Sequence, residues 1–148
     1  AVSLDVTRSG CLVDGEDASV AIRGPEVTGA VSAVAANPDV RVEMVARQRK
    51  WVTELGGGVM EGRDIGSVVF PDAEVKVYLT ASPEVRAQRR AAEVPGLDVD
   101  AAAADIRRRD EADSSRTASP LVTADGAQVL DTSELTVDGV VDAIVEML

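Results

Sequence analysis

Histidine is absent from this 148-residue sequence, and cysteine occurs only once. Without histidine, Ser-His-Asp triads, Cys-His pairs and histidine-ligated metal sites are excluded. Cys11 alone cannot form an internal disulfide, which is consistent with a reducing compartment. The sequence has no run of about 20 apolar residues for a membrane span, and residues 1–10 lack the charged start and apolar core of a signal peptide. We therefore expect a cytoplasmic protein that makes no membrane contact.

Positive charge is scarce and unevenly distributed. The net charge of -11 argues against a nucleic-acid polymer as partner, because such binding requires clustered basic residues that neutralise phosphates. Only Lys50 and Lys76 are lysines; the other thirteen basic residues are arginines, seven of them between positions 86 and 116. Arginine recognises phosphate or carboxylate groups through a planar donor fork. A high-GC codon bias would also raise the arginine content, and a small anionic ligand is compatible with both explanations.

The length indicates one domain with a sizeable core. Residues 2–6 alternate apolar and polar, and Asp14-Gly15 is a turn dipeptide, so residues 1–24 predict a small antiparallel meander. Pro25 is expected to open a helix that ends at Asn37-Pro38, and a second helix should run to the glycines at 56–58. We expect Trp51 to pack in the core. Residues 58–60 are expected to form a short strand.

The second half of the sequence predicts strands that alternate with helices. Residues 75–81 predict a strand, followed at once by a helix with Ser82 as N-cap and Pro83 at its first position. Asp98 or Asp100 should cap another helix, and residues 128–132 should form a last strand. Strand followed directly by helix indicates an α/β fold. Thr136 is expected to cap a terminal helix whose buried stripe is formed by Val140, Val141, Ile144, Val145 and Leu148.

The motif Gly62-Arg63-Asp64 has the composition of a ligand-facing turn. Glycine lets the backbone approach a ligand closely, Arg63 can hold an anion, and Asp64 can accept hydrogen bonds from an amine or hydroxyl. The equally weighted alternative is an ordinary polar loop held by a local ion pair.

Two further groups of charged residues are candidates for a site. Arg86, Arg89 and Arg90 are spaced so that their side chains emerge on one side of a helix, which is also the pattern of a solvated basic face. In the other group, Arg109, Asp113 and Arg116 share one helical face while the helix persists; the arginines could hold a phosphate and the aspartate a sugar hydroxyl. Taken alone, this second pattern equally describes a salt-bridged surface stripe worth well under ~1 kcal/mol per exposed pair.

Several of these motifs, in this order, resemble bacterial cytidylate kinase. The resemblance runs from about residue 10 to the C-terminus and implies an α/β fold with the parallel sheet of P-loop nucleoside-monophosphate kinases, flanking helices and a small antiparallel insert. Residues 1–37 would belong to the CMP-binding insert region, and 38–148 to the C-terminal part of the kinase core, including a lid at about 86–98. The motifs that carry the resemblance are GRDIGSVVFPDA (62–73), the strand at 75–81, SPEVRAQRR (82–90), RDEADSSR (109–116), PL (120–121) and, upstream, GED (15–17), IR (22–23), PEV (25–27) and VSAVA (31–35).

The resemblance implies phosphoryl transfer from ATP, with Mg²⁺, to CMP or dCMP by a monomer. Ser32, Arg41 and Asp64 resemble the cytosine readers, and a carboxylate can accept from the N4 amine of cytosine, which uracil lacks. The other matched positions concern phosphate and sugar. Arg63 and Arg116 resemble the residues that bind the monophosphate, and Arg109 and Asp113 resemble the pair that holds the sugar and its phosphate. Arg86, Arg89 and Arg90 resemble the lid arginines that neutralise charge on the transferring group.

One motif of that family is missing from the sequence. The phosphate loop G-x-x-x-x-G-K-[ST] does not occur, since neither Lys50 nor Lys76 follows a glycine. We expect the first strand and this loop to be missing. The chain would then be either an incomplete copy of a CMP kinase or a natural nucleotide-binding or interaction module without catalysis. The lid arginines favour the incomplete copy. We expect these 148 residues alone to be inactive, and phosphoryl transfer by them would refute that expectation.

Overall fold

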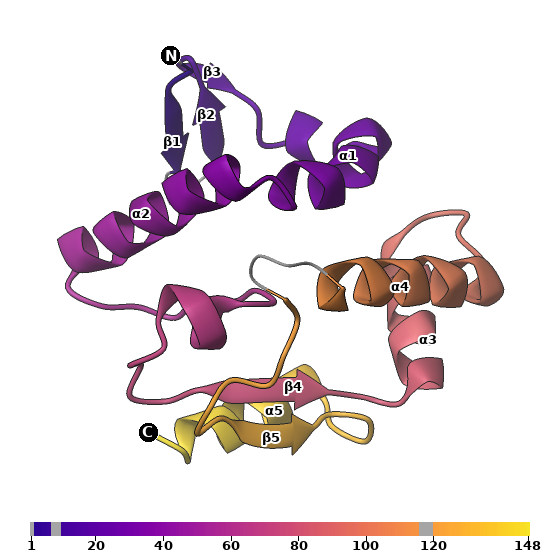
Figure 1. The fold of residues 1–148 in the computed structure, drawn as a ribbon. Helices are drawn as coiled ribbons and strands as arrows, with labels where there is room; N and C mark the ends of the chain where they lie inside the picture. The colour runs from indigo at the N-terminus through magenta and orange to yellow at the C-terminus, as the bar shows by residue number, and fades with distance from the viewer. Residues whose placement is uncertain (1, 7–9, 116–119) are drawn as a thin grey trace. The chain divides into compact units, whose positions relative to one another are not determined.

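The structure is a computed structural model of the chain, and it describes residues 2–6, 10–115 and 120–148. The chain forms two compact units, residues 1–41 and 42–148, and each is described by itself (Figure 1). The division expected from the sequence after residue 37 stays a prediction.

The first unit begins with a three-stranded antiparallel sheet. Its strands follow chain order, β1 (Leu4–Val6), β2 (Cys11–Val13) and β3 (Glu16–Asp17). Between β2 and β3, Asp14 (φ 52°) and Gly15 (φ 84°) both adopt left-handed backbone angles, which aspartate and glycine tolerate best. The predicted antiparallel meander is confirmed.

Two helices with proline at their first position follow a short 3-10 turn, η1 (Ala21–Arg23). They are α1 (Pro25–Ala35) and α2 (Pro38–Leu55), as the sequence predicts. The side chain of Asn37 accepts the backbone N–H two residues further on (2.9 Å), which satisfies a donor at the start of α2. After continuing into the second unit, α2 ends where Gly56 takes up φ 73°.

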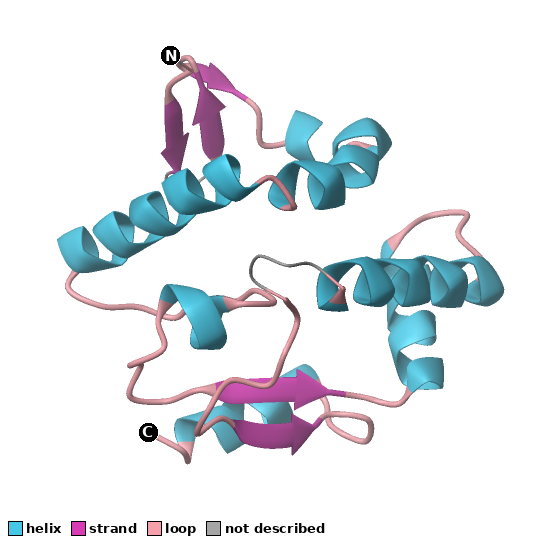
Figure 2. Cartoon of the chain, viewed as in Figure 1, coloured by secondary structure: helices cyan, strands magenta, loops and turns pink. Residues whose placement is uncertain are grey.

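The second unit is built on a parallel strand pair, β4 (Val77–Thr80) and β5 (Gln128–Asp131). The chain between them contains α3 (Pro83–Glu93) and α4 (Val99–Ser114), which pack against each other, and α5 (Val137–Val145) follows β5 (Figure 2). A parallel pair requires such a long helical connection. The expected α/β class, with a parallel sheet, flanking helices and a small antiparallel sheet, is confirmed.

Three predicted helix caps are present. Ser82, Asp98 and Thr136 each accept the backbone N–H of the residue three positions on, at 3.2, 2.9 and 3.1 Å respectively. Each bond satisfies a donor that has no partner within its own helix. The beginnings of α3, α4 and α5 are therefore encoded locally in the sequence.

No strand forms at residues 58–60, so that prediction is wrong. Val59 is 99% exposed, and its backbone has no strand beside it within the described part of the chain. The chain instead runs irregularly into a single π-helical turn, η2 (Ile65–Val69), directly after Gly62-Arg63-Asp64. The motif therefore begins a helical turn and does not end a strand.

The prediction that Trp51 packs in the core is also wrong, because its side chain is 41% exposed. Glu43 and Arg47 form an i,i+4 ion pair on α2, and Trp51 lies one further turn along the same exposed stripe. The half-buried face of α2 carries the smaller side chains of Val45 and Val52.

The buried stripe expected on α5 is narrower than predicted. Val140 and Ile144 are half-buried, whereas Val141, Val145 and Leu148 are 52%, 58% and 88% exposed. Positions 140 and 144 lie one turn apart on one face of the helix, Val141 and Val145 lie on the neighbouring face, and Leu148 lies beyond the end of the helix at Val145. A helix of only nine residues thus half-buries one row of side chains and leaves the next row in solvent.

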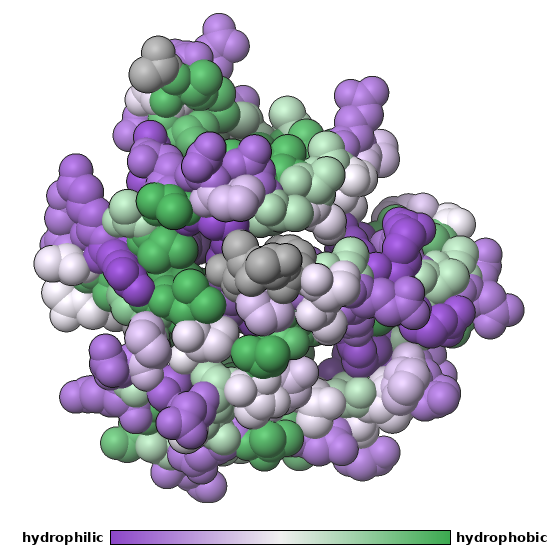
Figure 3. All heavy atoms as spheres, in the orientation of Figure 1, coloured by the Kyte–Doolittle hydropathy of each residue, from purple (hydrophilic) through white to green (hydrophobic). Residues whose placement is uncertain are grey.

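The fully buried apolar side chains in the described residues are small or medium in size: Val69, Ala87 and Ala102. Apolar side chains also reach the surface between charged ones (Figure 3). Among the described helices, none is both long and apolar enough to span a membrane.

Candidate functional site

The loop before η2 is held by contacts at both of its ends. At Gly62 a Cβ atom would lie 2.8 Å from Cγ1 of Ile65, so the close approach of the chain favours glycine there. The carbonyl of Asp64 accepts the N–H of Val68 (2.9 Å), which starts the helical turn. The side chain of Asp64 is buried, at 6% exposed. Arg63 and Asp64 are thereby fixed at the start of a turn with a defined backbone.

Arg49 holds the other end of η2. From α2, its Nε donates to the carbonyl of Val69 (2.8 Å) and its Nη2 to that of Val68 (2.9 Å). Carbonyl groups at the end of a helical turn have no partner within the turn, and a cation is favoured beside them. Arg49 therefore ties the turn that follows Asp64 to α2.

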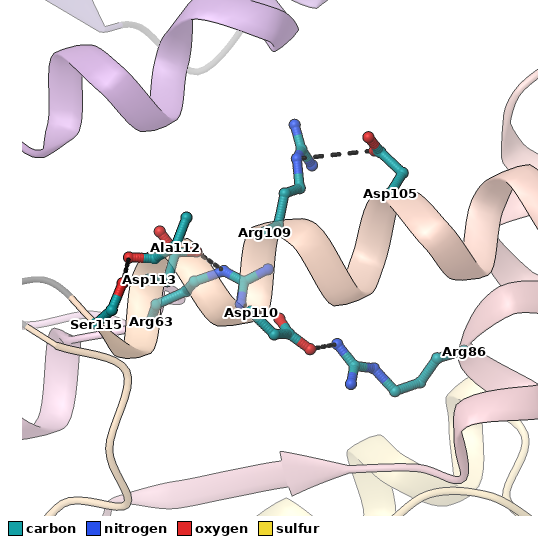
Figure 4. Close-up of polar contacts among 8 residues, drawn as sticks. All are labelled: Arg63, Arg86, Asp105, Arg109, Asp110, Ala112, Asp113 and Ser115. Atoms are coloured by element: carbon teal, nitrogen blue, oxygen red, sulfur yellow. Dashed lines mark hydrogen bonds and ion pairs between the residues drawn. The ribbon is translucent and has the colours of Figure 1, made fainter.

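Arg63 reaches across to α4 and contacts two carboxylates there (Figure 4). Its Nε lies 2.9 Å from Oδ2 of Asp113, and its Nη1 lies 2.5 Å from Oδ1 of Asp110. The Asp113 side chain is only 8% exposed, while that of Arg63 is 37% exposed. The buried carboxylate of Asp113 thus orients the guanidinium group of Arg63, while part of the Arg63 side chain stays exposed to solvent.

Asp110 also binds Arg86 of α3, since its Oδ2 lies 2.6 Å from Nη2 of that arginine (Figure 4). Burial alone would raise the pKa of Asp110, but hydrogen bonds from Arg63 and Arg86 and the charges of both arginines outweigh it and lower the pKa below 3.8. Asp110 is therefore an anion at neutral pH. Two arginines from different elements converge on this one carboxylate.

Arg109 also lies on α4, four positions before Asp113, as the sequence predicts. Its Nε lies 3.9 Å from Oδ2 of Asp105, and the side chain projects from α4 on the side away from Arg86 in the view of Figure 4. Arg116 lies outside the described residues, so its predicted role stays a prediction.

The three arginines of α3 have three different kinds of partner. Arg86 binds Asp110, whereas Arg90 lies 3.5 Å from Glu93 on its own helix. Arg89 donates to the hydroxyl of Thr132 (2.9 Å) and to the carbonyl of the same residue (2.6 Å), just after β5. The sequence places these side chains on one side of a helix, but their guanidinium groups bind different partners.

Ser32 and Arg41, the other two predicted cytosine readers, lie in the first unit. Ser32 is on α1 and Arg41 on the first turn of α2, and both are half-buried. The part of the site described above comes from the second unit alone. The expectation that these two residues join Asp64 stays a prediction.

Comparison with known proteins gives the family. A family model described as cytidylate kinase matches residues 1–148. Among curated relatives named cytidylate kinase, that of Rhodococcus opacus is 56% identical over 88% of this chain, that of Streptomyces griseus 52% over 92%, and that of Corynebacterium glutamicum 48% over 99%. This chain belongs to the cytidylate kinase family. It spans 58%, 59% and 66% of the length of those three relatives.

For a member of the cytidylate kinase family, the structure adds two residues that sequence reasoning did not select. Asp110 stands inside the charged run 109–116, and Arg49 within the helix expected before the glycines at 56–58, but the sequence assigns neither a role. A half-buried arginine requires an acid nearby, and Arg63 is half-buried in the structure. No spacing in the sequence identifies which acid that is.

The contacts of Arg89 lead to a stability prediction for buried Thr132. The Thr132 hydroxyl donates to the carbonyl of Thr80 (3.0 Å) and accepts from Arg89. We expect Thr132→Val to lower the free energy of unfolding by about 1–3 kcal/mol, because it removes both hydrogen bonds of the buried hydroxyl, one of them from a charged group, while the backbone bonds to Thr80 and from Arg89 remain. Urea unfolding measures the change, with Thr123→Val at an exposed position as the matched control. A loss no larger than that of the control would contradict the prediction.

Proposed function

We propose that the complete protein transfers the γ-phosphoryl group of ATP to CMP or dCMP, and that this chain supplies the acceptor-nucleotide site. The observation that carries the proposal is the convergence of Arg63 and Arg86 on Asp110, with buried Asp113 behind Arg63. Guanidinium groups with donors left over, oriented by fixed carboxylates, suit a phosphate monoester. Membership of the cytidylate kinase family supports the same reaction. We also propose a cytoplasmic monomer, as the resemblance implies.

In this proposal, Arg63 and Arg116 grip the monophosphate of the acceptor. Arg63 is the better supported of the two because its guanidinium group is oriented by Asp110 and Asp113. Asp113 also takes part with Arg109 in holding the sugar and its phosphate. Both lie on α4, so one rigid helix would carry this part of the acceptor site.

In this proposal, Asp64 recognises the cytosine base together with Ser32 and Arg41. A carboxylate is a pure hydrogen-bond acceptor when charged, so it matches the N4 amine of cytosine and mismatches the O4 carbonyl of uracil. Burial of Asp64 supports this assignment, because a polar group in a site poorly accessible to water discriminates more strongly than one in solvent.

In the reaction, an oxygen of the acceptor's monophosphate attacks the γ-phosphorus of ATP. The bond from that phosphorus to the β,γ-bridging oxygen breaks, ADP leaves, and the acceptor becomes the diphosphate. Arg86, Arg89 and Arg90 would neutralise charge on the transferring group. Arg86 is the best placed of the three, since it already contacts the cluster around Arg63, whereas Arg89 is engaged by Thr132.

Magnesium enters this proposal with ATP. The described residues contain no group of three or more His, Cys, Asp or Glu side chains that could hold a metal ion. No described residue of this chain is therefore assigned as a ligand of Mg²⁺.

The proposal is tested by a phosphoryl-transfer assay on the complete protein with ATP, magnesium and a panel of acceptors. We expect CMP and dCMP to be phosphorylated with a kcat/KM at least about tenfold above that of UMP, a factor within the range of one base-specific contact. Binding of CMP without any transfer would refute the kinase and support a nucleotide-binding module. Absence of CMP binding would refute both.

A further inference from the structure

Asp110 connects two segments that are far apart in the sequence. Its Oδ1 binds Nη1 of Arg63, 47 positions away in the loop before η2, and its Oδ2 binds Nη2 of Arg86, 24 positions away on α3. Each carboxylate oxygen thus serves a different arginine (Figure 4). We call these two contacts of Asp110, with Arg63 and with Arg86, the bridge. The side chain of Asp110 is 26% exposed, so the bridge is partly shielded from water, which would otherwise weaken it.

Both arginines retain donors beyond this bridge. A guanidinium group has five N–H donors. The bonds to Asp110 and Asp113 use Nε–H and one Nη1–H of Arg63, and the bond to Asp110 uses one Nη2–H of Arg86. Arg63 therefore keeps both N–H groups of Nη2 and one of Nη1 for a phosphate, and Arg86 keeps Nε–H, both N–H groups of Nη1 and one of Nη2.

The bridge also compensates a repulsion. Two guanidinium groups that approach the same point carry like charges, and their repulsion grows as water is excluded. A single anion between them removes that cost and fixes the place of each group. Arg63 has a second acid in Asp113, whereas the described side-chain contact of Arg86 in this cluster is with Asp110 alone.

We propose that Asp110 is a positioning residue that holds Arg63 and Arg86 as one phosphate-binding pair, so that binding of the acceptor's phosphate at Arg63 also places α3 through Arg86. This inference rests on the proposed function, since it takes Arg63 as the grip on the monophosphate. Asp110 itself does not touch the nucleotide. It acts through the two arginines that it orients.

The test compares affinities for CMP and for cytidine, which lacks the phosphate, by calorimetry on the complete protein. We expect Asp110→Asn to weaken CMP binding by about tenfold, the scale of one charge-assisted hydrogen bond, and to change cytidine binding by less than about twofold. The matched control is Glu111→Gln, which removes the same charge at the next position of α4 from an exposed side chain and should leave both affinities unchanged.

A second arm asks whether Asp110 acts through Arg63. In an Arg63→Met background, Asp110→Asn should weaken CMP binding by less than it does in the wild type, because only Arg86 is then left for Asp110 to position. Unchanged or tighter CMP binding by Asp110→Asn in the otherwise wild-type protein would overturn the inference, as would an equal loss for cytidine. Where the asparagine variant does not fold, Asp110→Glu serves instead; it keeps the charge, moves the carboxylate, and should weaken CMP binding alone.

Different results would refute the phosphate site at Arg63 and the positioning role of Asp110. Failure of Arg63→Met to weaken CMP binding would refute the phosphate site of the proposed function. A loss with Arg63→Met but none with Asp110→Asn or Asp110→Glu would leave that site in place and refute the positioning role of Asp110.

Discussion

Replacement of Arg63 by methionine is expected to weaken CMP binding by at least about 100-fold. Charge-assisted hydrogen bonds are worth roughly 1.5–3 kcal/mol each, and Arg63 has enough remaining donors for two bonds to a phosphate. Cytidine should lose less than about threefold, because it lacks the group that Arg63 holds. The methionine side chain keeps the apolar stem of arginine, so the change chiefly removes the guanidinium group. Calorimetry with both ligands measures the difference.

Two further variants show whether geometry or charge is responsible. Arg63→Lys keeps the positive charge but lacks the fork that reaches Asp110, Asp113 and a phosphate together, so we expect an intermediate loss. Arg47→Met is the matched control, since Arg47 forms an exposed ion pair with Glu43 on α2 and should bind CMP as the wild type does. Equal losses for cytidine and CMP in Arg63→Met would show a folding defect and contradict the assignment.

Replacement of Asp64 by alanine is expected to remove the preference for cytosine. Each good base-specific contact contributes about 1–3 kcal/mol of discrimination, so kcat/KM for CMP should fall by roughly 10- to 100-fold. That for UMP should change little, because uracil gains nothing from a carboxylate at O4. The ratio of the two values in one preparation reports on the base alone, since any loss of folded protein affects both acceptors equally.

Asp72→Ala is the control for this experiment. Asp72 is exposed in the turn that follows η2, so its removal takes away the same charge from the same segment. We expect the CMP-to-UMP ratio to stay at the wild-type value in that variant. A wild-type ratio in Asp64→Ala would exclude Asp64 as the cytosine reader.

Local signals account for what could be predicted of the fold. Prolines at first helical positions, the caps Ser82, Asp98 and Thr136 and the Asp14-Gly15 turn act over a few residues, and each lies where the sequence indicates. These signals set the order and type of most elements. They also set α3 and α4 beside each other, because a short turn joins two helices in succession.

Tertiary contacts decided the rest. Whether Trp51 is buried depends on which face of α2 has a neighbour, and whether residues 58–60 form a strand depends on a strand to pair with. The candidate site behaves in the same way. The motif at 62–64 identifies Arg63 as a candidate and helical spacing identifies Asp113. Asp110 gains its importance from contacts with Arg63 and Arg86, which come from remote segments. Helical spacing also could not indicate that Arg86 and Arg89 have separate partners.

We propose that the guanidinium group of Arg63, held by Asp110 and Asp113, binds the phosphate of the acceptor nucleotide. A crystal structure of the complete protein with CMP tests this binding most directly. We expect CMP phosphate oxygens at about 2.7–3.2 Å from the nitrogens of Arg63, the range of a hydrogen bond. A CMP phosphate bound elsewhere, with Arg63 still contacting only Asp110 and Asp113, would contradict it.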